Sequence, residues 1–527
     1  MRVSVRFITV LVACLSTAAI CVETVKAQPV TPGAQAMTLS LERARQLALE
    51  KNYTFRAQVL NPLISEAQVS ERLGSFDPTL RANVDGSHTA TPNQISVTTV
   101  VDTVTGAQQQ FVTSTPIPSS DGLEGSVSLS KLFSYGTQTS VSARSSWVTR
   151  SNTDSWNSRL TLDVTQPLLK GFGRDVTMGG VLLARNSQEQ SMIQLEQNAF
   201  ETIIATESAY WNLVLAREQL EVAKLALDAA QQLLDRSKAR IESGAQAQYE
   251  LLSAEAEVAA RQQEIIQRQA AVGQAQDELK RLTGIAQLPI GWAIDILPTE
   301  QPLVATRVAA ADSLLSMALR SRPDVRVAEQ QRDARLLSLR LQHNARMPSL
   351  NATGGLTLAD GSPRSYSKSL DEIVTVEYPS WNVGLQLSMP IGNRSADGQY
   401  RQARLQVRQT ELAFQALQLK VHQELRDAVR TVESTREQIQ AAEITVNLRE
   451  ADLNNQQERL RLGLATNYDV LLKERDLADA RRSLLQAQIS HQKAIVNLQA
   501  ATGELLEVRG IRVQPRDDEN DESNGRG

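Results

Sequence analysis

The chain has few of the residues that enzymes use for catalysis or metal binding. Only four of its 527 residues are histidine, two are cysteine, and aromatic residues make up 4%. Cys14 and Cys21 lie near the N-terminus, so a mature chain without that segment would have no disulfide or thiol chemistry. No Ser/His/Asp, Cys/His or metal-ligand spacing stands out, and a formal charge of −4 gives no nucleic-acid footprint. We therefore predict a protein that is not an enzyme, has no cofactor or metal, and does not bind nucleic acid.

Long apolar runs are also missing. After residue 27 no stretch offers 18 consecutive apolar residues, so any membrane span must be made of β-strands. Residues 1–27 are typical of a signal peptide, because Arg2 and Arg6 precede an apolar run that ends at Val25-Lys26-Ala27. A competing interpretation is a lipoprotein signal that would lipidate Cys14. Cleavage at the end of the segment is favoured, since the lipoprotein signal would have an unusually short apolar core.

The chain contains an internal sequence repeat. RLTG at 281–284 and AATG at 500–503 are 219 residues apart, whereas DPTL at 77–80 and MPSL at 347–350 are 270 apart. The spacing between matching segments falls from 270 to 219 residues along the chain, so the first copy contains about fifty residues that the second lacks. Self-similarity of this kind indicates an internal structural repeat. The predicted parts are a first repeat over 28–284, an equatorial connector over 285–311, a second repeat over 312–503 and an acidic, disordered tail over 504–527.

Each copy contains a block suited to a very long helix. Residues 181–243 and 399–462 contain neither glycine nor proline, the two residues that disfavour helix interiors. Leu213, Leu220 and Leu227 recur every seven residues, a spacing typical of helices packed along their lengths. A glycine then interrupts each block, which suits a tight turn between two helices. The predicted long helical hairpins cover 181–282 and 397–501, with tip turns at Gly244 and Gly463.

Strands with one apolar face are predicted ahead of each long helix. Apolar and polar residues alternate without a break in 381–389 and 350–358, and again in 80–85 and 160–165. Strands of about nine residues with this period are what a membrane barrel requires. The predicted β regions are about 79–166, with a Thr-, Ser- and Gln-rich extracellular loop near 88–124, and about 349–389. A further hairpin at 125–147 leaves the strand count of the first copy open.

The junctions and tips carry a family resemblance. Gln166 to Arg174 (QPLLKGFGR) leads from strand into long helix, and Met389-Pro390-Ile391-Gly392 is its counterpart. Six residues after each tip glycine stands an acid, and each copy closes on a Thr-Gly pair. In this ordered set the chain resembles the TolC family of outer-membrane channel-tunnel proteins. The barrel-to-helix junction residues are then Pro167, Gly171, Pro390 and Gly392.

The resemblance implies an α+β membrane protein that assembles as a homotrimer. Each subunit would give four strands to a twelve-stranded outer-membrane β-barrel, continued by a long α-helical periplasmic barrel. An independent argument also requires several chains, because about four strands cannot close a barrel and an open edge in lipid leaves backbone groups unpaired.

The resemblance also implies a cell outer-membrane location, with a large periplasmic portion, and passive conduction in a tripartite efflux or type I secretion system. Its partners would be outer-membrane lipids, a periplasmic adaptor (membrane fusion protein) and an inner-membrane RND, ABC or MFS transporter. Grooves near the tips would receive the adaptor's helical hairpin. The alternative is a periplasmic coiled-coil adaptor or scaffold that does not span the outer membrane, but a soluble scaffold has no need of strands with one lipid-suited face.

The tips are the candidate gate. In a trimer, Glu250 and Asp469 would place six carboxylates around the periplasmic entrance, which favours cations and can raise the pKa of crowded acids. The simpler alternative is that each acid only favours a helix start through the helix dipole. Tyr249 and Tyr468 are matched tip contacts, which either hydrogen-bond across the tip or contact an adaptor. The simpler alternative is that each packs against the neighbouring hairpin.

Several other residues have a structural interpretation. Family members can lock the tip with a tyrosine and an arginine, but this chain has Leu460 and Ala465 at those places. Arg240 and Arg461 are therefore candidate partners for the tip acids. His491, at a heptad position, is predicted to be a packed histidine, and Gly171 and Gly173 are predicted to shape the bend between strands and helices.

Overall fold

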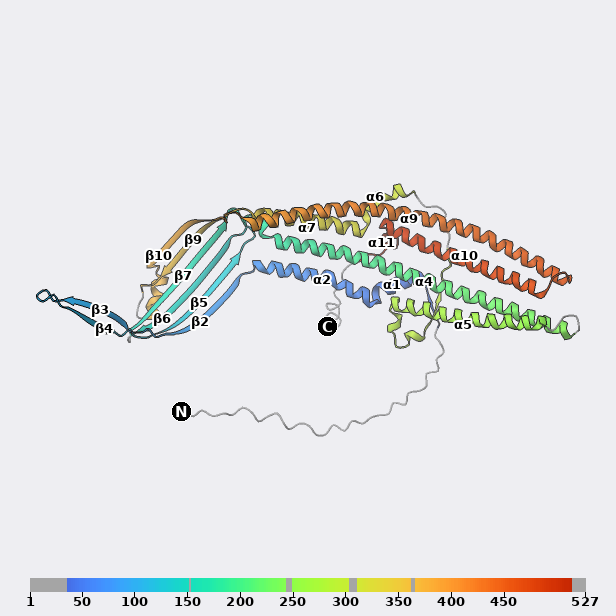
Figure 1. The fold of residues 1–527 in the computed structure, drawn as a ribbon, viewed down its shortest axis with the longest axis horizontal. Helices are drawn as coiled ribbons and strands as arrows, with labels where there is room; N and C mark the ends of the chain where they lie inside the picture. The colour runs from blue at the N-terminus through green and yellow to red at the C-terminus, as the bar shows by residue number, and fades with distance from the viewer. Residues whose placement is uncertain (1–35, 151–152, 243–248, 303–309, 362–364, 514–527) are drawn as a thin grey trace, which may run out of the picture.

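The computed structural model describes residues 36–150, 153–242, 249–302, 310–361 and 365–513. A β-sheet occupies one end of this elongated chain and long helices run away from it to the other end (Figure 1). The predicted signal segment and the tip glycine Gly244 lie outside the described residues.

Two antiparallel helical hairpins form the helical part. The first joins α4 (Gly179–Glu242) to α5 (Tyr249–Thr283), and the second joins α9 (Arg394–Arg461) to α10 (Asn467–Thr502). The predicted long helices are thus present, with 64 residues in α4 and 68 in α9. Among the described residues, no helix is both long and apolar enough to cross a membrane.

Shorter helices lie beside the long ones (Figure 1). They are α1 (Leu41–Lys51), α2 (Tyr53–Leu73), α6 (Ala311–Ser321) and α7 (Pro323–Ala345). Helix α2 packs on α4 as α7 packs on α9, so each short helix occupies the length of the long helix that the hairpin partner leaves uncovered. Pro323 stands at the start of α7, where its missing N–H has no helical partner to lose.

The helices bury part of the predicted heptad rows, while Leu220 and Leu227 keep an intermediate exposure. Leu213 is fully buried with Tyr210 and Leu279 in one cluster, while Val432 and Leu425 belong to a second cluster in the other half of the molecule. Burying a leucine side chain contributes about 2 kcal/mol. The seven-residue spacing therefore correctly identified the packed faces of these helices.

The sheet is larger than the resemblance implied. Its six antiparallel strands follow the order β10-β9-β7-β6-β5-β2. Their bounds are β2 (Thr79–Thr89), β5 (Ser120–Leu132), β6 (Gln138–Arg150), β7 (Thr153–Pro167), β9 (Ser349–Ala359) and β10 (Tyr378–Ser388). The expectation of four strands per subunit is therefore wrong for the described sheet. The hairpin predicted at 125–147 accounts for the difference, because β5 and β6 are full members of the ladder.

Part of the predicted extracellular loop is also a hairpin. Strands β3 (Gln94–Val101) and β4 (Gln108–Thr115) pair with each other as a separate two-stranded sheet. Figure 1 shows it projecting past the end of the main sheet, away from the helices. Threonine is common both in strands and in loops, so its abundance did not reveal this hairpin. The extracellular position of the segment stays a prediction. A second small sheet pairs β1 (Ala36–Leu39) in parallel with β8 (Asp295–Pro298) of the connector.

The tail predicted over 504–527 begins with ordered structure. Helix α11 (Leu505–Val508) follows α10 directly, and the Leu505 side chain is fully buried among residues of α4 and α10. Prediction of disorder from residue 504 onward was therefore wrong for residues 504–513. The acidic composition that suggested disorder belongs mainly to residues after 516.

A buried carboxylate ties this C-terminal segment to the helices. Glu207 of α4 exposes 1% of its surface and pairs with Arg45 of α1 at 2.7 Å and with Arg509 at 3.1 Å. Two cations on one buried carboxylate satisfy its charge and its hydrogen-bonding capacity.

We predict that Glu207→Gln lowers the free energy of unfolding by about 3 kcal/mol, because it leaves two partly buried guanidinium groups without their counter-charge. A lowered Tm of the purified protein would show it. The matched control is Glu201→Gln, which removes an exposed acid from the same helix and should shift Tm by less than one degree or so. Equal shifts for the two variants would contradict the assignment.

Candidate functional site

The tip of the second hairpin is a short glycine turn. Gly463 has φ of 71°, a left-handed conformation that glycine adopts without steric cost. Its N–H donates to the carbonyl of Leu460 at 3.1 Å, and the N–H of Leu464 donates to that of Arg459 at 2.8 Å. These two bonds make a Schellman motif, which satisfies the last carbonyls of α9. The predicted tip turn at Gly463 is present.

Asp469 caps the next helix. The Asp469 carboxylate accepts from the Thr466 backbone N–H at 2.9 Å and from the Thr466 hydroxyl at 2.7 Å, while the Asp469 N–H donates back to that hydroxyl at 3.3 Å. This capping box starts α10. The bond from the Thr466 backbone, then that from its hydroxyl, lower the pKa of Asp469 below its ordinary value. The simpler alternative considered for this acid, a helix-start role, is thus built into the structure.

The corresponding residues of the first hairpin are only partly described. Tyr249 and Glu250 are the first residues of α5, and their side chains lie outside the described part. Both hairpins end at the same extremity of the chain, the one farthest from the sheet (Figure 1). The gate-ring assignment of Glu250 and Asp469 stays a prediction.

Two expectations about tip contacts change. Tyr468 exposes 64% of its surface, so within one chain it does not pack against the neighbouring hairpin. Arg461 pairs with Glu458 through its Nε at 2.9 Å, one turn away on the same helix, rather than with Asp469. That pairing raises the pKa of Arg461 and lowers that of Glu458. Arg461 is therefore committed to its own helix.

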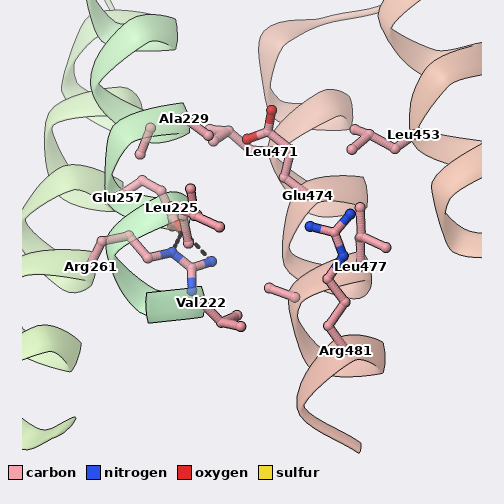
Figure 2. Close-up of a pocket in the computed structure, with 13 residues that line it drawn as sticks. Val222, Leu225, Ala229, Glu257, Arg261, Leu453, Leu471, Glu474, Leu477 and Arg481 are labelled. Atoms are coloured by element: carbon pink, nitrogen blue, oxygen red, sulfur yellow. Dashed lines mark hydrogen bonds and ion pairs between the residues drawn. The ribbon is translucent and has the colours of Figure 1, made fainter. Parts of the chain in front are cut away.

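A groove separates the two hairpins on the tip side of the molecule. Figure 2 shows Leu225 and Ala229 of α4 facing Leu471 and Leu477 of α10. The space that these residues line has a volume of about 150 Å³. Leu225 exposes 63% of its side chain there. An apolar groove flanked by helices is suited to receive another amphipathic helix.

Charged side chains hold the sides of this groove. Arg261 pairs with Glu257 at 2.8 Å and with Glu264 at 3.0 Å, all on α5. Arg482 of α10 reaches Glu264 at 2.6 Å and so links the two hairpins. Burial raises the pKa of Glu474, which lines the groove from the α10 side (Figure 2). The sequence analysis did not predict a role for these charged residues. The only signal for them in the sequence is the i,i+3 and i,i+4 spacing of opposite charges along α5.

The junction between sheet and helices depends on glycine. Gly171 has φ of 85°, and its N–H donates to the Asn344 side-chain oxygen at 2.8 Å. A Cβ added to Gly136, in the β5–β6 turn, would lie 2.7 Å from the Gly171 carbonyl oxygen. Pro167 ends β7 at this point. Gly136 therefore has no room for a Cβ, whereas Gly171 is needed for its left-handed backbone.

The second junction is built differently. Pro390 and Gly392 lie between β10 and α9, and Gly392 has φ of 91°. The predicted junction glycines of both copies thus adopt left-handed backbone. Their role in connecting membrane and periplasmic parts stays a prediction.

His491 is packed, as predicted. It is fully buried and its Nδ1 lies 3.0 Å from the Thr435 hydroxyl of α9, so it joins the two helices of the second hairpin. Burial lowers its pKa. Within the described residues, no group of three or more His, Cys, Asp or Glu side chains could hold a metal ion.

Comparison with known proteins agrees with this geometry. A family model described as "Outer membrane efflux protein" matches residues 134–285 and 314–504, more than half of the chain. The chain belongs to the TolC family of outer-membrane efflux proteins. It is 21% identical over 315 residues to outer membrane protein TolC of Vibrio cholerae, covering 58% of this chain and 68% of that protein. It is 23% identical over 351 residues to the outer membrane efflux protein BepC of Brucella suis, covering 65% and 72%.

Solved structures of similar fold are outer-membrane channels. The Campylobacter jejuni CmeC channel matches with a TM-score of 0.62 at 18% identity, covering 92% of this chain and 88% of that one. The channel OprN matches with a TM-score of 0.63 at 16% identity, covering 88% and 89%. TolC-family proteins are outer-membrane channels with a large periplasmic portion, and they are not enzymes. The predicted family, α+β fold and location are therefore confirmed.

Proposed function

We propose that this TolC-family chain acts as a homotrimer, in which three sheets close one barrel in the outer membrane and three sets of helices form one tunnel across the periplasm. The observation that carries the proposal is the open sheet. Within the described chain, β2 and β10 each pair on one side only. An unpaired strand edge in lipid costs several kcal/mol per backbone group, so neighbouring copies must cover both edges.

A division into two repeats is part of the same proposal. Each matched segment of the family model contains a strand pair followed by a long helical hairpin. This supports repeats over 28–284 and 312–503 with the connector between them. Thr283-Gly284 and Thr502-Gly503 end the hairpins at equivalent places, and both glycines are left-handed, with φ of 70° and 81°.

Transport is passive in this proposal. Cargo enters from a periplasmic adaptor coupled to an inner-membrane RND, ABC or MFS transporter, and leaves through the barrel. The groove between Leu225 and Leu477 is the proposed seat of an adaptor helix, because it is apolar, open and flanked by charges. A periplasmic adaptor that never spans the outer membrane was the alternative; the family's outer-membrane location argues against it.

The tips form the closed end in this proposal. Glu250 and Asp469 of three copies would ring the entrance, with Tyr249 and Tyr468 beside them. The capping bonds keep Asp469 charged well below neutral pH, because they favour its ionised form. A carboxylate that caps a helix still presents its charge to passing ions.

We predict that the reconstituted channel prefers cations and that Asp469→Asn with Glu250→Gln moves the cation-to-anion permeability ratio toward one. Planar-bilayer reversal potentials in a salt gradient measure this ratio. Glu437→Gln is the control, since it removes an exposed acid of α9 far from the tip. An unchanged ratio in the double variant would remove the ring assignment.

A further inference from the structure

The hydrogen-bonded register aligns one apolar row across the whole sheet. Leu80 of β2 faces Leu129 of β5, which faces Val141 of β6. The row continues without a break to the second repeat, through Leu162, Leu356 and Trp381. Paired residues in an antiparallel ladder point to the same face. Each of the six strands therefore gives a large apolar side chain to one face.

The neighbouring row is polar along its whole length. Its residues, one per strand from β2 to β10, are Arg81, Ser128, Ser142, Thr161, Thr357 and Ser380. This row points to the opposite face because adjacent side chains alternate. An apolar outside and a polar inside are the two faces of a membrane barrel strand with a water-filled lumen.

The central strands β5 and β6 show the same two faces as the others. Val127, Leu129 and Val141 are each at least 40% exposed in one chain, as are Leu162 and Leu356 of the strands that the resemblance predicts. A hairpin standing outside the barrel in water would leave this apolar row hydrated, which is unfavourable in proportion to its area. All six strands have at least eleven residues, enough to span a bilayer.

Aromatic residues mark both ends of these strands. Trp147 of β6 lies opposite Trp156 of β7 near the end distant from the helices, on the apolar face. Phe133 and Tyr135 stand in the β5–β6 turn at the other end, each more than 40% exposed. Aromatic girdles of this kind lie at the two interfaces of a membrane barrel.

The free edges fit each other. Strands β2 and β10 both have eleven residues, and they run in opposite directions because five antiparallel pairings separate them. A β2 edge meeting the β10 edge of the next copy would extend the same antiparallel ladder. Closure needs no change of strand direction, which an odd number of strands would have required.

We propose that all six strands line the pore, so that three copies close an eighteen-stranded barrel through β2–β10 pairing. This inference rests on the proposed trimeric channel and changes its width. Barrel diameter grows about linearly with strand number, so the pore is about half as wide again as a twelve-stranded one. Barrels of this size hold an aqueous channel, suited to hydrated, polar cargo. The tips, not the barrel, then limit what passes.

The test uses single cysteines and a charged, membrane-impermeant thiosulfonate on the protein in outer-membrane vesicles. Ser142→Cys, on the polar face of β6, should be labelled as fast as Thr357→Cys of β9. Val141→Cys, on the apolar face, should be protected as well as Leu356→Cys. Equal labelling of the two β6 positions would place the hairpin in water and overturn the inference. Equal labelling rates for Leu356→Cys and Thr357→Cys of β9 would instead refute the membrane-spanning sheet, and with it the proposed function.

Closure is tested by disulfides between copies. Asn83→Cys on the polar face of β2 is combined in turn with cysteine at each even position of β10 from Ser380 to Ser388, which covers the possible registers. At least one pair should give covalent multimers on a non-reducing gel. Ser128→Cys, one strand inward, is the control and should give none with the same partners. Multimers from the control alone, or from no pair, would overturn β2–β10 closure.

Discussion

Replacing Gly503 with alanine is expected to lower the free energy of unfolding by about 3 kcal/mol and to reduce the amount of assembled protein. Gly503 has φ of 81°, which costs an alanine about 1 kcal/mol or more. An added Cβ would also lie 2.7 Å from the Ser321 carbonyl carbon and 2.8 Å from the Arg322 nitrogen. These are backbone atoms at the break between α6 and α7, so they cannot move aside as a side chain would.

The equivalent substitution in the first repeat should behave alike. A Cβ on Gly284 would lie 2.7 Å from the Lys51 Cβ and 2.9 Å from its carbonyl oxygen, at the break between α1 and α2. Gly273→Ala is the matched control, because Gly273 lies exposed inside α5 with nothing near its missing Cβ. That change should raise stability by up to about 1 kcal/mol. Thermal unfolding of the three variants measures the contrast, and a destabilising Gly273→Ala would contradict it.

This contact explains why the Thr-Gly pairs recur in the sequence. Each pair ends the second helix of a hairpin, and its glycine lets the chain touch the break between two short helices. Residues 51 and 321 are 270 apart, while 284 and 503 are 219 apart. The 270-residue offset therefore relates the two breaks between short helices, and the 219-residue offset relates the two glycines that contact those breaks. The repeat could be recognised without the structure, but the reason for its glycines could not.

The long helices were predictable because their signals are local. Absence of glycine and proline over sixty residues and a seven-residue apolar spacing are properties of one segment. The connector and the C-terminal segment were not predictable in this way. Strand β8 has four residues, and Leu505 is buried only because α4 and α10 meet there. Such elements depend on partners far away in the sequence.

In the candidate site, too, the local features were predictable from the sequence and the contacts between distant residues were not. Glycine spacing located the tip turn at Gly463, since a turn is set by its own residues. The sequence could not say that the Asp469 carboxylate would bind Thr466, nor that Arg461 would bind Glu458. The groove required two hairpins to be placed side by side, so Leu225 and Leu477 gave no signal of their own. The prediction of four strands per subunit was wrong for a related reason. Alternating apolar and polar residues identify a strand, but they do not show which sheet the strand joins.

Placing an arginine on the apolar row is expected to have the second large effect. In Leu162→Arg the charge replaces a side chain near the middle of β7, between Val141 and Leu356. An arginine facing lipid near the bilayer midplane costs about 2 to 4 kcal/mol, and a trimer carries three. We therefore expect the variant to be largely absent from the outer membrane. Quantifying folded trimer in membrane fractions, by its resistance to unfolding in detergent without heating, measures this.

Thr161→Arg is the decisive control because it moves the same charge by one residue. Thr161 lies in the polar row between Ser142 and Thr357, where the proposed lumen keeps an arginine hydrated. Arg159 of the same strand already lies on that face. The two variants add the same charge one residue apart on the same strand, and they place it on opposite faces. A large loss for Leu162→Arg with near-normal Thr161→Arg would identify the apolar row as the lipid surface. Equal losses would mean that both faces are enclosed by protein, and neither the barrel nor its width could then stand.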